Sequence, residues 1–92
     1  MNYILNKGIQ MEVLEDGIII FNEETENVIY LGENEKKLFE MLLKKDFVSV
    51  VNELKSMYEK EAPIEEDLRD FCRDLEKEGI ISKNNDDYLC EN

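Results

Sequence analysis

The first third of the chain contains short stretches rich in apolar residues, and in one of them apolar and polar positions alternate. The alternation over 9–14 and the apolar run 18–21 predict two strands, and the run 27–31 predicts a third. Asp16-Gly17 separates the first two strands, and this pair is typical of a hairpin because glycine accepts the positive φ that a tight turn requires. An acidic turn over 23–26 separates the second strand from the third. We therefore expect a three-stranded antiparallel meander.

After Gly32 the apolar residues recur every three or four positions, which indicates helices. We expect three of them, over about 33–44, 46–59 and 64–79. Asp46 suits the N-cap of the second helix, Pro63 suits the first turn of the third, and Gly79 suits its end. The aromatic residues on the apolar faces of these helices are assigned to the core: Phe39, Phe47, Tyr58 and Phe71.

The two ends of the chain carry weaker patterns. Residues 1–8 contain a short apolar patch that stays unassigned, and 80–82 and 88–90 flank a polar turn that fits either a small terminal hairpin or a tail. Ninety-two residues suffice for one hydrophobic core. We expect a single domain over 1–92 with its core over about 9–81. Its class is α+β and winged-helix-like, a three-stranded antiparallel sheet followed by three helices.

Acidic residues outnumber basic ones by 23 to 11, which gives a net charge of −12. A field of this sign repels the phosphates of nucleic acids and anionic membrane surfaces. In a winged-helix DNA reader the third predicted helix would be the recognition helix, yet here it carries seven acidic and three basic residues. Such a helix is pushed out of a major groove, so we expect neither nucleic acid nor a membrane as partner.

Side chains suited to catalysis or metal binding are scarce. The chain has no histidine, and Cys72 and Cys90 are far apart in the sequence and form no Cys-x-x-Cys pair. The usual general base is therefore missing. We expect no enzymatic activity, no catalytic residue, no metal site and no cofactor. No apolar run is long enough to span a membrane and no signal segment precedes the first strand, so we expect a cytoplasmic protein.

The strand over 27–31 is the candidate binding element. Its four apolar residues are Val28, Ile29, Tyr30 and Leu31, and every predicted helix follows it, so we expect it at an edge of the sheet. The unpaired N–H and C=O groups of an edge strand must be blunted, covered by the chain's own termini, or used to capture an extended peptide. Val28 and Tyr30 share one face, which points either at the helices or at a bound peptide.

The order of these features resembles the PqqD-like family, whose members are known as RiPP recognition elements. The resemblance runs from Asp16-Gly17 through Leu31 to Gly79-Ile80-Ile81 and covers about 9–81. The matching positions between them are Leu38, Phe39, Asp46, Tyr58, Leu68, Phe71 and Leu75. The resemblance implies a winged-helix-like, non-catalytic protein that binds the leader region of a ribosomally synthesised precursor peptide.

Members of that family bind the leader as an added strand, in the groove between the third strand of the meander and the third helix. They present the peptide to a modifying enzyme such as a radical SAM enzyme, a cyclase or a leader peptidase. Carried onto this chain, the resemblance implies main-chain contacts at 28–31 and contacts from one flank of the third helix: Arg69, Cys72, Arg73 and Glu76.

That flank is the better candidate wall for a groove, because it combines an apolar residue with fixed charges. Without the resemblance, Cys72 fits plain core packing, and Arg69 and Arg73 fit solvated ion pairs with acidic neighbours on the helix. The alternative function is a winged-helix regulator or DNA mimic that acts on another protein.

Overall fold

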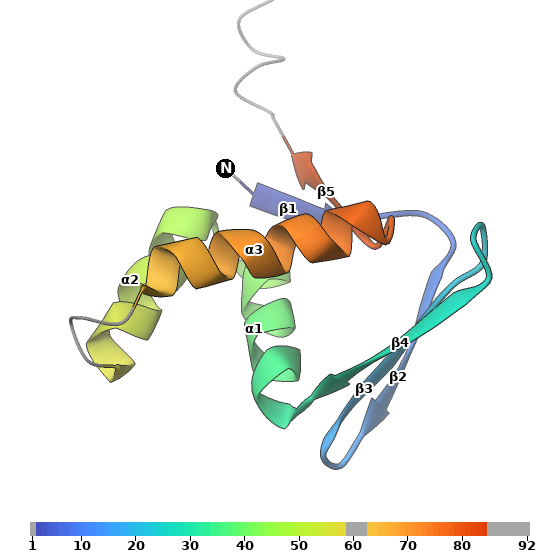
Figure 1. Ribbon diagram of the computed structural model, residues 1–92, viewed down its shortest axis with the longest axis horizontal. Coiled ribbons are helices and arrows are strands. Elements are labelled where there is room, and N and C mark those ends of the chain that lie inside the picture. Colours follow the sequence, from blue (N-terminus) through green and yellow to red (C-terminus); the bar gives the residue numbers. More distant parts are fainter. Residues whose placement is uncertain (1, 59–62, 85–92) are drawn as a thin grey trace, which may run out of the picture.

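The computed structural model describes residues 2–58 and 63–84, in which five strands and three helices surround one core (Figure 1). The strands are β1 (Asn2–Leu5), β2 (Ile9–Leu14), β3 (Gly17–Asn22), β4 (Asn27–Gly32) and β5 (Ile81–Asn84). The helices are α1 (Glu33–Lys44), α2 (Phe47–Met57) and α3 (Ile64–Lys77). The α+β class expected from the sequence is confirmed.

The predicted meander is formed by β2, β3 and β4, an antiparallel sheet with β3 in the centre. β4 therefore lies at an edge, as expected. The role predicted for Gly17 is wrong, because positive φ angles in the described residues occur at Gly8, Glu26 and Gly79. Glycine is needed at the start of β3 for space instead, since a Cβ on Gly17 would clash with the carbonyl oxygen of Leu31.

A second antiparallel pair joins β1 to β5, with Asn2 opposite Asn84 and Leu5 opposite Ile81. Sequence patterns leave residues 1–8 unassigned because the two strands lie at opposite ends of the chain and no local turn signals their pairing. The sequence analysis considered a terminal hairpin formed by 80–82 and 88–90. The first of these segments overlaps β5, which pairs with β1, and 88–90 lies outside the described residues.

The three helices bury their apolar faces around the core. α1 packs against β1, β3 and β4, and α2 packs against α1 and α3. Phe39 and Phe47 are buried and Phe71 is half-buried against the core, as expected. The assignment of Tyr58 to the core is wrong, because it is the C-cap residue beyond the last turn of α2 and its side chain is 57% exposed.

The helix ends agree with the expected caps in all but one detail. The Asp46 carboxylate accepts a hydrogen bond from the Ser49 N–H at 2.7 Å, which lowers the pKa of Asp46 and marks it as the N-cap of α2. Pro63 occupies the N-cap position of α3 rather than its first turn. Gly79, with φ +71°, ends α3, and the Ile80 N–H donates to the Leu75 carbonyl in a Schellman motif.

Side-chain hydrogen bonds join the C-terminal end of α3 to the hairpin of β3 and β4. The buried Asn22 donates from Nδ2 to the Glu78 carbonyl at 2.9 Å, and Asn27 Nδ2 lies 3.5 Å from the Glu78 carboxylate. The start of β4 is thereby fixed against the end of α3. Figure 1 shows α3 and β4 running apart from this junction, with α1 continuing from the far end of β4.

Candidate functional site

The side chains of β4 alternate between the helices and solvent. Ile29 and Leu31 pack against the core, whereas Val28 and Tyr30 are 62% and 54% exposed. The sequence left open whether Val28 and Tyr30 face the helices. In the structure both side chains point away from them. The Tyr30 hydroxyl donates to the Asp16 carbonyl at 3.1 Å, which holds the ring over the turn between β2 and β3.

One hydrogen bond identifies which backbone groups of β4 face outward. The Gly32 N–H donates to the Glu35 side chain at 3.3 Å, so it does not face β3. Bonded and non-bonded residues alternate along an antiparallel strand, so Val28 and Tyr30 also direct their N–H and C=O groups away from β3. Within 2–58 and 63–84, β3 is the strand that pairs with β4. The outer edge of β4 thus offers main-chain donors and acceptors to an extended chain.

Cys72, one of the residues predicted on α3, lies in the core. It is 1% exposed, and its thiol lies beside the Tyr3 hydroxyl of β1. Burial raises the pKa of the Cys72 thiol and that of the Tyr3 hydroxyl. The side chain therefore has the packing role that the sequence also allowed, and it presents no surface to a peptide.

The two arginines of α3 are held by neighbours. The Arg69 guanidinium carbon lies 5.0 Å from the centre of the Phe47 ring, and the guanidinium pairs with Glu65 at 3.0 Å. Arg73 pairs with Asp70 at 3.1 Å in solvent. The flank that carries Arg69 and Cys72 thus faces the start of α2 and β1 rather than β4. Peptide contacts by Arg69, Arg73 and Glu76 stay predictions.

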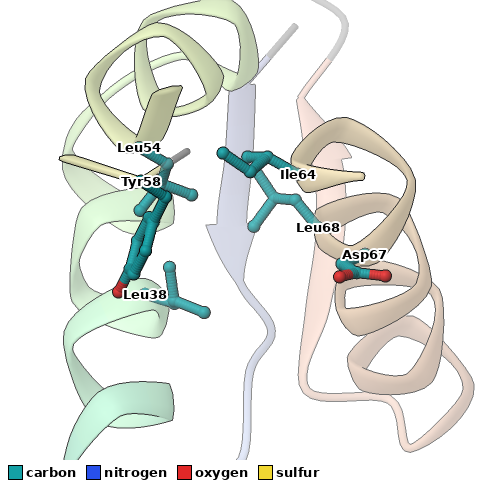
Figure 2. A pocket seen from close by; sticks show the side chains of 6 residues that line it. All are labelled: Leu38, Leu54, Tyr58, Ile64, Asp67 and Leu68. Atoms are coloured by element: carbon teal, nitrogen blue, oxygen red, sulfur yellow. The ribbon is translucent and has the colours of Figure 1, made fainter. Parts of the chain in front are cut away.

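A hollow of ≈ 250 Å³ opens between α1, α2 and the first turns of α3. Figure 2 shows apolar side chains of α1 and α2 facing those of α3 across it. Its described lining residues are Leu38, Leu54, Tyr58, Ile64, Asp67 and Leu68. Sequence reasoning missed this hollow because three separate helices supply its walls, and only their packing brings those residues together.

The flank of α3 that borders the hollow is acidic. Spacings of three and four residues place Asp67, Phe71, Asp74 and Glu78 along it. In the described part of the chain, the ion pairs of α3 join Glu65 to Arg69 and Asp70 to Arg73, and none involves Asp67 or Asp74. Among the described residues, this flank therefore presents negative charge that forms no ion pair.

The described residues contain no group of three or more side chains that could hold a metal ion. Within the same residues, no helix is both long and apolar enough to cross a membrane.

No protein-family model matches the sequence, and no curated protein matches it. Two solved structures share its fold at 19% sequence identity. TbiB1 in complex with the TbiA(beta) leader peptide has a TM-score of 0.77 and covers 88% of this chain and 96% of its own. Lasso peptide synthetase B1 complexed with the leader peptide has a TM-score of 0.79, with coverages of 90% and 100%. The chain has the fold of these leader-peptide-bound proteins, which confirms the fold that the resemblance to the PqqD-like family implied.

Proposed function

We propose that this protein binds the leader region of a ribosomally synthesised precursor peptide as an added strand on β4. The observation that carries the proposal is the outer edge of β4, where Val28 and Tyr30 direct main-chain groups away from β3. Main-chain bonding gives affinity that tolerates sequence variation, and nearby side chains supply selectivity. The two solved structures of the same fold hold leader peptides, which supports this class of ligand.

The bound strand lies between β4 and α3 in this proposal. For the wall on α3 we propose the flank with Ile64, Asp67 and Phe71, in place of the flank favoured from the sequence. On that other flank Arg69 contacts Phe47 and Cys72 is buried beside Tyr3, so peptide contacts there remain an untested prediction. The bond between Asn27 and Glu78 joins the start of β4 to the end of α3, and α1 continues from the other end of β4. We therefore expect the extended peptide to lie along the length of β4.

The protein supplies recognition, and a partner enzyme supplies the chemistry. The chain contains no histidine to act as the usual general base. We therefore assign modification of the peptide to a partner such as a radical SAM enzyme, a cyclase or a leader peptidase, to which this protein presents the bound precursor. Ribosomally made peptides arise in the cytoplasm, so we place the protein there.

Amide hydrogen exchange in the presence of a candidate precursor peptide tests the strand addition. Binding should slow exchange at Val28 and Tyr30, because their N–H groups pass from water to the peptide backbone. The amides of Ile29 and Leu31 serve as internal controls, since they already face β3. Tight binding without slower exchange at Val28 and Tyr30 would place the peptide elsewhere.

Two proline substitutions make a matched pair for the same test. Val28 in β4 and Val13 in β2 lie on opposite edges of one sheet and are 62% and 63% exposed. Proline is tolerated on an edge strand where the N–H faces solvent, so both variants should fold, as circular dichroism can verify. Val28→Pro should abolish peptide binding, and Val13→Pro should leave it unchanged. Equal losses in the two variants contradict strand addition at β4.

A further inference from the structure

We infer that the hollow between the three helices receives a lysine or arginine side chain of the bound peptide. This inference rests on the proposed function and names the chemical class of peptide that the site selects. The hollow combines apolar walls with one carboxylate, that of Asp67, among its described lining residues. Figure 2 shows the apolar side chains of Ile64 and Leu68 directed toward the α1 and α2 side of the hollow, with the Asp67 carboxylate on the α3 side.

The walls suit a side chain that is apolar along its stem and cationic at its tip. Lysine and arginine bury their methylene stems on apolar surface while the charged head reaches a polar group. Leu54 and Leu68 are 7% and 2% exposed and form the floor of such a site, and the exposed Tyr58 offers an aromatic face that attracts a cation. Asp67 is exposed, so its carboxylate lies where the charged head of such a side chain would reach solvent, and a wholly apolar anchor would make no contact with it.

Charge points to the same class of ligand. Asp67 forms no ion pair within residues 2–58 and 63–84, whereas Glu65 and Asp70 on the same helix are paired with arginines. The next acidic residue along the flank, Asp74, is also without an ion pair in that part of the chain. With a net charge of −12, the protein repels an acidic peptide and attracts a basic one before contact.

The position of the hollow fits a peptide that runs past the end of β4. Leu38 follows Gly32 by six positions, which is about 9 Å along α1 at 1.5 Å per residue. An extended peptide covers that length with about three residues. The basic residue should therefore lie about three positions beyond the segment that pairs with β4.

A display library of random twelve-residue peptides, selected on the full chain, tests the inference without a known precursor. We expect the enriched peptides to slow amide hydrogen exchange at Val28 and Tyr30. We also expect them to share a lysine or arginine at a fixed distance from the segment that pairs with β4. The affinity of one such peptide is then compared with that of its copy carrying norleucine at the basic position.

Two variants of the protein separate the effect of the hollow from that of net charge. Asp67→Asn should weaken binding of the basic peptide by about three- to tenfold and leave the norleucine copy unaffected. Asp70→Asn removes the same charge from the same helix, but Asp70 is paired with Arg73 and does not line the hollow, so binding should stay within about twofold.

The outcomes distinguish this inference from the proposed function. Enriched peptides that slow exchange at β4 but carry neutral or acidic residues at the fixed position overturn the inference alone. An Asp67→Asn effect no larger than that of Asp70→Asn overturns it as well. Failure to enrich any peptide, or binding that leaves exchange at Val28 and Tyr30 unchanged, counts against strand addition itself, and the inference falls with it.

Discussion

At the scale of single residues, Asn22 is the buried polar side chain that joins the hairpin to the end of α3. Its Oδ1 accepts the Glu24 N–H at 3.0 Å while its Nδ2 donates to the Glu78 carbonyl. Asn22→Ala leaves that carbonyl without its donor, so the free energy of unfolding should fall by about 1–3 kcal/mol in urea denaturation. Asn27→Ala, at an exposed position with a bond of 3.5 Å, should change it by less than about 0.5 kcal/mol. Equal effects would contradict the role of Asn22 as the junction.

Cys72 should be chemically silent in the folded protein. Burial raises the pKa of its thiol, so the reactive thiolate is scarce at neutral pH. A Cys90→Ser variant should react slowly with Ellman's reagent in native buffer and rapidly in urea. Because the pKa of the Cys72 thiol is higher in the folded than in the unfolded protein, its contribution to the free energy of unfolding depends on pH. This contribution is fully present below the ordinary thiol pKa and is lost as the pH rises through the higher pKa of the folded state. Fast reaction in native buffer would show that the thiol is accessible.

At the scale of elements, the short pair of β1 and β5 contributes to the core. Tyr3 is 5% exposed between β5, α1 and α3, whereas the next residue of β1, Ile4, is 46% exposed. Tyr3→Ala should lower the free energy of unfolding by about 3 kcal/mol, because it leaves a cavity under α3. Ile4→Ala removes an aliphatic side chain from the same strand and should cost less than about 1 kcal/mol. Comparable losses in chemical denaturation would mean that β1 does not pack as described.

The two edges of the three-stranded sheet differ in what surrounds them. α1 packs on β3 and β4, and the end of α3 is bonded to the hairpin between these strands. A peptide on β4 can therefore touch helices as well as backbone. A peptide on β2 would meet main-chain groups with fewer side chains to select it, which is why β4 is the edge suited to recognition.

At the scale of the whole molecule, charge separates this protein from the DNA readers that its winged-helix-like fold resembles. Its net charge is −12, and α3 contains the acidic flank of Asp67 and Asp74. We expect no measurable affinity for duplex DNA at physiological salt, because binding would need basic contacts to phosphate. Fluorescence anisotropy with a labelled duplex checks this. Tight binding at that salt would restore the alternative of a transcriptional regulator.

The local elements and the net charge of this protein can be predicted from its amino-acid sequence alone. Period-two alternation predicted β2, short apolar runs bounded by turn residues predicted β3 and β4, and helical spacing predicted α1, α2 and α3. The order of the strands placed β4 at an edge. The end of α3 at Gly79 also followed from local chemistry, because glycine adopts positive φ there without strain. These features depend on neighbours within a few residues, which a sequence pattern records directly.

How the faces of these elements contact one another depends on the packing of the folded chain and could not be predicted from the sequence. Helical spacing groups Cys72 with Arg69 and Ile64 with Asp67, but it does not say which group faces β1 and which borders α1. The pairing of β1 with β5 and the space requirement at Gly17 likewise involve residues distant in sequence. Periodicity fixes which side chains share a face, whereas the packing of separate segments fixes what each face contacts, and the candidate binding site depends on those contacts.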